Sequence, residues 1–200
     1  MLEDLTFKSL GLVNYHETMD LMRSHVKGEN FSNEIWLLEH PPIFTLGTAA
    51  DKKHILNVKD IPIVQSDRGG EVTYHGRGQL VIYFLLDIKK LEFSPNKLVS
   101  TIQNFVKDLL HELSIECNFI DGAPGVYVDK KKIASIGLRI SKGKSYHGIS
   151  LNFDMDLSPF KQINPCGYEG LEVVQIKDLN KDISKLQLEK LVIDLLRKIF

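Results

Sequence analysis

The segment INPCGYEG, residues 163 to 170, holds a cysteine between a proline and a glycine, where a thiol could act as a nucleophile. Cys166 is one of two cysteines in the chain, and their spacing suits neither a disulfide framework nor a zinc knuckle. Because free cysteine is among the most buried residue types, packing is the alternative interpretation. The other cysteine, Cys117, falls on a predicted strand and is expected in the core.

A second unusual segment is rich in glycine. In SDRGGEVTYHGRGQLVIY, residues 66 to 83, four glycines surround Arg68, Tyr74 and His75 just before an apolar strand. Glycine permits positive φ and close backbone approach, so this loop could wrap a ligand and present N–H groups to it. It matches neither a G-x-x-x-x-G-K-[ST] phosphate loop nor a G-x-G-x-x-G motif that opens a helix. A structural tight turn is the alternative.

Three consecutive lysines, Lys130 to Lys132, lie where a hairpin tip leads into an apolar strand. We expect Lys130 and Lys131 in a solvated turn, whereas Lys132 enters the strand and could point into a cleft. The histidines show no H-x-x-x-H or H-E-x-x-H spacing, so we predict no metal site.

The composition limits the class of protein. With 43% hydrophobic and 26% charged residues, the chain is expected to fold as an ordinary water-soluble globular protein. Its 200 residues suit one domain, spanning 1–200. A net charge of -1 provides no field for nucleic acid or anionic lipid. Without an apolar run of signal or transmembrane length, we expect a cytoplasmic protein whose partners include neither nucleic acid nor membrane.

Three amphipathic helices are predicted to flank these segments. Each starts at a capping residue followed by apolar residues at helical spacing. Asn14 begins the first helix, Ser94 with Pro95 begins the second, and Ser184 with Gln187 in a capping box begins the third.

Extended runs lie between the helices, at residues 33–40, 79–88, 124–129, 132–140 and 146–155. SKGKS, residues 141 to 145, is expected to join two of them as an antiparallel hairpin. In the last run Ile149 and Leu151 alternate with Gly148 and Ser150, which directs the apolar side chains to the core and the others away from it. The element order predicts an α+β fold rather than repeated βαβ units.

Together these segments resemble one family, the lipoyl(octanoyl) transferases (octanoyl-[acyl-carrier-protein]:protein N-octanoyltransferases). The matching stretches occur in the family's order and cover most of residues 37–179: LLEHPPIFTLG, RGGEVTYHGRGQLVIY, PGVYVDKKKIASIGLRI, HGISLNFDMDLSPFKQINPCG and VVQIKDL. Two positions depart from the family pattern, because Arg77 and Phe84 stand where members commonly have proline.

The resemblance implies a fold and a set of site residues. The fold is α+β, a mostly antiparallel mixed sheet flanked by helices, similar to the catalytic domains of biotin and lipoate ligases. In this family the cysteine matching Cys166 carries the acyl group as a thioester, and the lysine matching Lys132 activates it. The implied substrate-binding residues are Arg68, Gly69, Gly70, Glu71, Val72, Thr73, Tyr74, His75, Ser135, Ile136, Gly137, Gly148, Ile149 and Ser150.

The resemblance also implies the reaction, which is the first step of lipoate cofactor biosynthesis. An octanoyl or lipoyl group passes from acyl carrier protein to a lysine of a lipoyl domain, in 2-oxoacid dehydrogenase complexes or in the glycine cleavage H protein. No cofactor is expected, because conversion of a thioester to an amide is downhill and needs no ATP.

This chemistry makes physical demands on the site. An ammonium about 4 Å from a sulfur would favour the thiolate by about 4 kcal/mol at an effective dielectric of about 20, before desolvation. The acyl chain needs an apolar slot, which we expect between the loop at 68–75 and strand residues around Ile136 and Ile149. Exposed basic residues between Lys130 and Lys144 are expected to steer the acidic carrier protein.

Two rival interpretations remain open at this stage. An ATP-dependent lipoate or biotin ligase shares the fold but activates a free acid as an adenylate and needs no cysteine. A catalytically silent binding module on the same scaffold would lack the lysine and cysteine pair.

Overall fold

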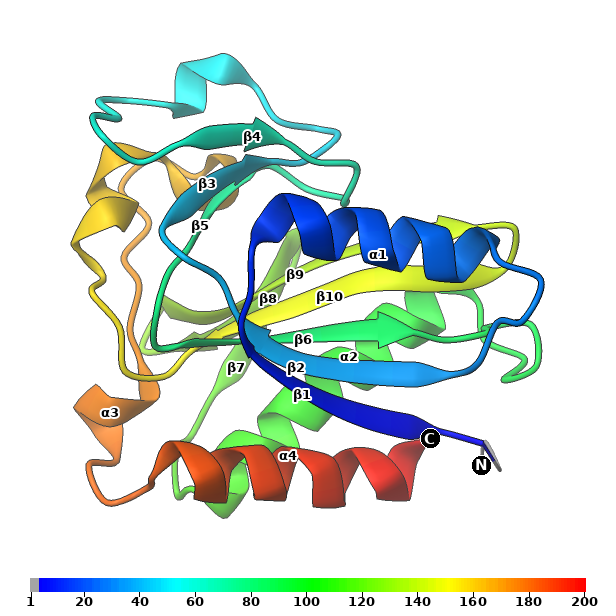
Figure 1. Ribbon diagram of the computed structural model, residues 1–200. Coiled ribbons are helices and arrows are strands. Elements are labelled where there is room, and N and C mark those ends of the chain that lie inside the picture. Colours follow the sequence, from blue (N-terminus) through cyan, green and yellow to red (C-terminus); the bar gives the residue numbers. More distant parts are fainter. Residues whose placement is uncertain (1–3) are drawn as a thin grey trace.

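The computed structural model of the protein describes residues 4–200, so the first three residues of the expected domain lie outside the described part. A seven-stranded sheet forms its centre, in the order β1-β2-β6-β10-β9-β8-β7 (Figure 1). The strands are β1 (Thr6–Leu12), β2 (Glu34–Glu39), β6 (Gln79–Leu85), β7 (Asn118–Ile120), β8 (Ala123–Val128), β9 (Lys131–Ser141) and β10 (Lys144–Asn152). Only the β1·β2 pair of this sheet is parallel, which confirms the predicted α+β fold with a mostly antiparallel sheet.

A second, smaller sheet lies above the main one in Figure 1 and was not predicted. It contains β3 (Ile43–Leu46), β4 (Ile63–Gln65) and β5 (Val72–His75), in the order β4-β3-β5. Strands of three or four residues between prolines and glycines are too short to show an alternating pattern. This sheet carries the glycine-rich loop at residues 68–75, because the last four residues of that loop form β5.

The three predicted helices are present and begin where their capping residues indicated. They are α1 (Tyr15–Lys27), α2 (Pro95–Glu112) and α4 (Lys185–Ile199), and α3 (Ile176–Leu179) is a single additional turn. The side chains of Asn14 and Ser94 accept hydrogen bonds from first-turn N–H groups, and Ser184 and Gln187 form the expected capping box.

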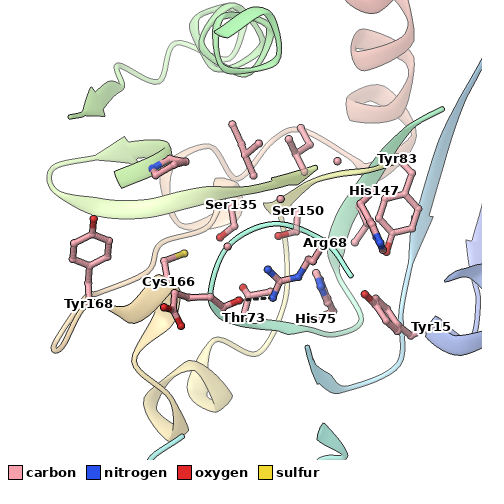
Figure 2. A pocket seen from close by; sticks show the side chains of 18 of the residues that line it. Tyr15, Arg68, Thr73, His75, Tyr83, Ser135, His147, Ser150, Cys166 and Tyr168 are labelled. Carbon is pink, nitrogen blue, oxygen red and sulfur yellow. Dashed lines mark hydrogen bonds between the residues drawn. The ribbon is translucent and has the colours of Figure 1, made fainter. Parts of the chain in front are cut away.

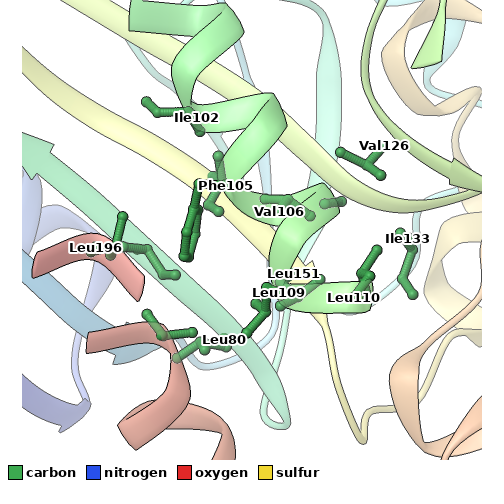
Figure 3. Packing of buried hydrophobic residues seen from close by; sticks show 14 of the residues in the cluster. Leu80, Ile102, Phe105, Val106, Leu109, Leu110, Val126, Ile133, Leu151 and Leu196 are labelled. Carbon is green, nitrogen blue, oxygen red and sulfur yellow. The ribbon is translucent and has the colours of Figure 1, made fainter. Parts of the chain in front are cut away.

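The helices cover opposite faces of the main sheet. On one face α2 and α4 pack against the largest apolar cluster, where Phe105 and Leu109 of α2 meet Leu80 and Leu151 of the sheet (Figure 3). On the other face α1 packs against a second cluster that includes Trp36. Strand β6 contributes alternate residues to both clusters, which explains its continuous apolar sequence QLVIYFL.

The hairpin of β9 and β10 has the predicted antiparallel pairing, with Ser141 opposite Lys144. Lys142 and Gly143 between them both have positive φ, as a two-residue primed turn requires. In β10, Ile149 and Leu151 face the core as predicted. Gly148 and Ser150 point to the other face of the sheet as predicted. They are also buried, because that face lines an internal cavity described below instead of facing solvent.

The two positions that depart from the family's prolines have simple surroundings. Arg77 is exposed in the turn between β5 and β6. Phe84 is fully buried in the centre of the sheet, opposite Ile35, with its ring near Phe200. None of the helices between residues 4 and 200 has the length and apolar character to cross a membrane.

The packing of α2 predicts a large asymmetry between two leucine truncations. Leu109 is fully buried, so Leu109→Ala is expected to lower the free energy of unfolding by about 3 kcal/mol through lost burial and a cavity. The control Leu186→Ala removes a leucine of α4 that is 78% exposed and should change stability by less than about 0.5 kcal/mol. Urea unfolding followed by circular dichroism measures both, and similar losses would contradict this packing.

Candidate active site

Cys166 occupies a strained turn. It lies in the 3-10 turn Pro165–Gly167 with φ 57° and ψ 22°, the left-handed region, which costs a non-glycine residue on the order of 1 kcal/mol. Gly167 is left-handed as well. The turn is closed by hydrogen bonds from Gly167 N to Asn164 O and from Tyr168 N to Pro165 O. These bonds hold the thiol at one end of a cavity (Figure 2).

Lys132 lies near the start of β9, and its side chain points at this thiol. Its Nζ donates hydrogen bonds to Cys166 Sγ at 2.9 Å and to Pro124 O at 3.0 Å. Lys132 is 1% exposed, so its ammonium is held out of bulk solvent beside the sulfur. Lys130 and Lys131 are exposed as predicted, and Lys131 forms an ion pair with Glu172 at 2.8 Å.

The main chain of Lys132 joins the cysteine-bearing segment to the sheet. Lys132 N donates to Glu172 O at 2.9 Å, and Val174 N donates to Lys132 O at 3.0 Å. This bridge lies just after the turn that carries Cys166 and keeps the two side chains together. Gly125 on β8 leaves room for them, since a Cβ there would lie 2.9 Å from Lys132 Cε.

The charge state of Lys132 follows from its neighbours. Burial is the largest single influence and would lower the pKa of Lys132, but the Cys166 sulfur and Tyr127 together outweigh it and leave the pKa above its ordinary value. An ammonium in contact with a sulfur favours a negative charge on that sulfur. Cys117, in contrast, is half-buried directly before β7, one residue short of its predicted strand, and burial raises the pKa of its thiol.

A cavity of about 220 Å³ extends from Cys166 between the main sheet and the loop 68–75. This volume lies below the roughly 300–1,000 Å³ of drug-sized sites and suits a slender ligand. Twelve of the sequence-predicted site residues line it: Arg68, Gly70, Glu71, Thr73, His75, Ser135, Ile136, Gly137, Gly148, Ile149, Ser150 and Cys166.

Three residues of the implied substrate-binding set lie elsewhere. Val72 and Tyr74 are buried in a separate apolar cluster with Phe44, because alternate residues of β5 point to opposite faces. Thr73, between them, points into the cavity. Gly69 also stays off the cavity wall, and its N–H donates to Leu138 O of β9 at 3.0 Å.

Seven further residues line the cavity without having been predicted: Tyr15, Val81, Tyr83, Gly122, Pro124, His147 and Tyr168. Val81 and Tyr83 face it because β6 pairs with β10, placing them opposite Ser150 and Gly148. That register is not visible in the sequence. Tyr168 was within reach of sequence reasoning, since it stands two residues after Cys166.

Arg68 braces the glycine-rich loop from within. Its guanidinium donates to Thr45 O at 2.7 Å, Glu71 O at 2.7 Å, Gly69 O at 2.9 Å and Thr45 Oγ1. Within residues 4–200 its partners are carbonyl and hydroxyl oxygens rather than carboxylates. Burial lowers the pKa of this guanidinium from its very high ordinary value. The buried group therefore fixes the loop that forms one wall of the cavity.

A chain of buried polar side chains continues from this loop to the main sheet. His75 Nδ1 donates to Gln79 Oε1 at 2.7 Å, and Gln79 Nε2 donates to Asn152 Oδ1 at 3.0 Å. At the far end of the cavity, His40 accepts a hydrogen bond from Tyr83 OH at 2.8 Å and donates one to Val13 O. Burial lowers the pKa of His40 to about 4, so it is neutral at pH 7.

Asp67 is the carboxylate that precedes Arg68, and it accepts three side-chain hydrogen bonds. Burial would raise its pKa, but hydrogen bonds from His147, Tyr146 and Arg23 outweigh burial and hold the pKa below its usual range. Two of the residues that line the cavity carry a buried polar atom without a hydrogen-bond partner within residues 4–200, Thr73 Oγ1 and His147 Nδ1. Over the same residues, no three His, Cys, Asp or Glu side chains gather as they would around a metal ion.

Comparison with known proteins assigns the chain to a family. The family model of the lipoyl protein ligase A/B catalytic domain matches residues 14–198. The chain belongs to this family. An octanoyltransferase of Dechloromonas aromatica is 54% identical over 175 residues, covering 86% of this chain and 85% of the relative. An octanoyltransferase of a Marinomonas species is 50% identical over 182 residues, covering 90% and 85%. These relatives confirm the predicted acyltransferase class.

Solved structures share the fold of this family. A lipoate-protein ligase A bound with ATP aligns with a TM-score of 0.74 at 15% identity, covering 100% of this chain and 85% of its own. A biotin protein ligase from Aquifex aeolicus aligns with a TM-score of 0.56, covering 99% and 69%. The predicted likeness to the catalytic domains of these ligases is confirmed.

The neutral burial of His40 predicts a pH dependence of stability. Its pKa is about 4 in the folded protein, against about 6.5 in an unfolded chain. Its contribution is therefore fully present above about pH 6.5 and is lost as the pH falls, because the unfolded chain then binds a proton that the folded protein does not. We expect His40→Gln to reduce the slope of unfolding free energy against pH by up to about 1.4 kcal/mol per unit in this window. Urea unfolding across the window measures it, and an unchanged slope would contradict the neutral burial.

Proposed function

We propose that this single domain, spanning 1–200, transfers an octanoyl or lipoyl group from acyl carrier protein to a lysine of lipoyl domains, through a thioester on Cys166. The observation that carries the proposal is the 2.9 Å contact of Lys132 Nζ with Cys166 Sγ at the end of a narrow cavity. Relatives named octanoyltransferase support the identity of the acyl group. The transfer is the first step of lipoate cofactor biosynthesis.

In the first step the Cys166 thiolate attacks the carbonyl carbon of the carrier thioester. A new sulfur–carbon bond forms at Cys166 and the bond to the carrier sulfur breaks. The proton of the Lys132 ammonium passes to the departing carrier thiolate, so the carrier leaves as a neutral thiol. The enzyme is left with an octanoyl thioester on Cys166 and an uncharged amine on Lys132.

The second step reverses the proton transfer. The acceptor lysine, after losing one proton to solvent, attacks the Cys166 thioester as a neutral amine. The amide forms, the sulfur leaves as thiolate, and Lys132 takes the proton released from the attacking nitrogen. The thiolate and ammonium pair is then restored. An uncharged Lys132 is favoured between the steps, since it is 1% exposed and its anionic neighbour has become a neutral thioester.

The cavity can hold the acyl chain. Val81 and Tyr83 contribute apolar surface on the sheet side, and the loop braced by Arg68 closes the opposite side. The side chains of Ile136 and Ile149 pack into the core on the other face of the sheet, so the expected slot is not formed by their side chains. Burying about six methylenes at roughly 0.8 kcal/mol each yields about 5 kcal/mol. That energy keeps the acyl chain in the cavity while the Cys166 thioester forms and later breaks.

The proposed partners are those that the family resemblance implies. The donor is octanoyl-acyl carrier protein, and the acceptors are the lipoyl domains of 2-oxoacid dehydrogenase complexes and the glycine cleavage H protein. A related fold from Thermoplasma acidophilum is described as a bi-partite lipoate protein ligase with its E2 lipoyl domain. The reaction belongs in the cytoplasm, where a free thiol stays reduced.

The basic segment expected to steer the donor divides into two parts. Strand β9 has 11 residues, so its ends lie about 33 Å apart. Lys130 and Lys131 lie at the Cys166 end, whereas the exposed Arg139 and Lys142 lie toward the far end. Lys144 is half-buried with its Nζ bonded to Val26 O. We therefore assign donor steering to Lys130 and Lys131 alone.

The thioester predicts a mass shift. After incubation with octanoyl-acyl carrier protein, the intact protein should gain the mass of one octanoyl group, because the carrier thiol is a leaving group that Cys166 can replace. Cys166→Ala should abolish the adduct, and the matched control Cys117→Ser should retain it. Lys132→Met should slow adduct formation by at least about tenfold, the equivalent of about 1.4 kcal/mol. Folded, active protein without an adduct would rule out the covalent route.

A second prediction separates this proposal from an ATP-dependent ligase. Octanoyl transfer from carrier protein to an isolated lipoyl domain should proceed without ATP and should be lost in Cys166→Ala. Free octanoate with ATP and magnesium should support no transfer, because the proposed route contains no adenylate. Transfer that requires ATP and survives Cys166→Ala would assign the chain to the ligases.

A further inference from the structure

Tyr127 is a buried aromatic residue that the proposed steps do not use. It lies on β8 directly opposite Lys132 of β9 and is 1% exposed. Lys132 Nζ stands over its ring, 5.1 Å from the centroid. A cation within about 6 Å of an aromatic face is attracted by the electron density of that face. Tyr127 is not one of the described residues that line the cavity. Its influence on the reaction therefore passes through Lys132.

The ring completes the surroundings of the ammonium. An ammonium has three N–H donors and is costly to bury unless each finds a partner. Cys166 Sγ receives one hydrogen bond at 2.9 Å and Pro124 O receives another at 3.0 Å. The face of Tyr127 is the remaining neighbour on β8 that can stabilise the positive charge.

Strand β8 is shaped to hold the ring in this position. The Tyr127 hydroxyl donates to Ala123 O of the same strand at 3.1 Å. The β8·β9 register shifts between Val126 and Tyr127, which changes the direction in which the ring points. Gly125, with φ +142°, leaves the space that the Lys132 side chain crosses. In the segment PGVY, Pro124 thus provides a carbonyl acceptor, Gly125 leaves space for the side chain of Lys132, and Tyr127 provides an aromatic face next to its amine.

We infer that Tyr127 is a positioning residue, whose ring face holds the Lys132 ammonium against Cys166. The inference deepens the proposed function and rests on it only for the pairing of these two side chains. Both parts of the side chain act on the ammonium: the ring stands 5.1 Å from Nζ, and the nearby hydroxyl also raises the pKa of Lys132.

The test uses the pH dependence of Cys166 alkylation by iodoacetamide, in a Cys117→Ser background that leaves one reactive thiol. Position 127 carries tyrosine, phenylalanine, 4-fluorophenylalanine or 3,4,5-trifluorophenylalanine, because fluorine weakens the face while nearly preserving the shape. The pH of half-maximal rate should rise for phenylalanine, which lacks the hydroxyl, and rise further with each fluorination of the phenylalanine ring, by about one unit over the fluorinated series. Tyr127→Leu should show at least the same rise.

Two controls make the result decisive. Lys132→Met, which removes the ammonium, should raise the same midpoint by more than any change at position 127. A flat midpoint across the fluorinated series, with Lys132→Met shifted, would overturn the role of Tyr127 and leave the octanoyl adduct of the proposed function intact. A midpoint that also ignores Lys132→Met would overturn both the pairing and the positioning role. Melting temperatures identify a merely structural effect, which would change stability without a graded shift.

Discussion

A buried ammonium in contact with a sulfur is the constraint on which the site depends. Such a charge is costly inside a protein unless its hydrogens find partners, and two of the three hydrogens on Lys132 Nζ find them here. The main chain of β8 supplies the carbonyl of Pro124, and the turn at Cys166 supplies the sulfur. The left-handed backbone of Cys166 is strained by itself, and it persists because it brings the thiol to that point.

The cavity beside this pair is kept open by hydrogen bonds rather than by apolar packing alone. Arg68 ties the glycine-rich loop, at Gly69 and Glu71, to Thr45 of β3. The chain through His75, Gln79 and Asn152 ties the small sheet to the main one. A purely apolar slot would be free to close on itself. Polar walls with satisfied partners cannot collapse without losing those bonds, which makes the slot a fixed feature of the fold.

The sequence was most informative where structure is determined locally. Asn14, Ser94 and Ser184 located the helix starts because a cap acts on its own first turn. The small sheet, the strand register and the contact of Lys132 with Cys166 depend on residues far apart in the chain, which no local pattern reveals. The family resemblance supplied the pairing instead. It also implied Val72 and Tyr74, which β5 directs into a core, a distinction that strand alternation in VTYH could have suggested once that strand was known.

The main-chain bridge at Lys132 links reactivity to local unfolding. The residue that activates the thiol also closes the loop that carries it, through hydrogen bonds with Glu172 and Val174. Any opening large enough to swing Cys166 outward therefore detaches it from its amine at the same time. The exposed thiol of such an open form would be an ordinary, mostly protonated one. Local unfolding of the loop therefore switches the nucleophile off, because the sulfur is activated only while the loop is closed.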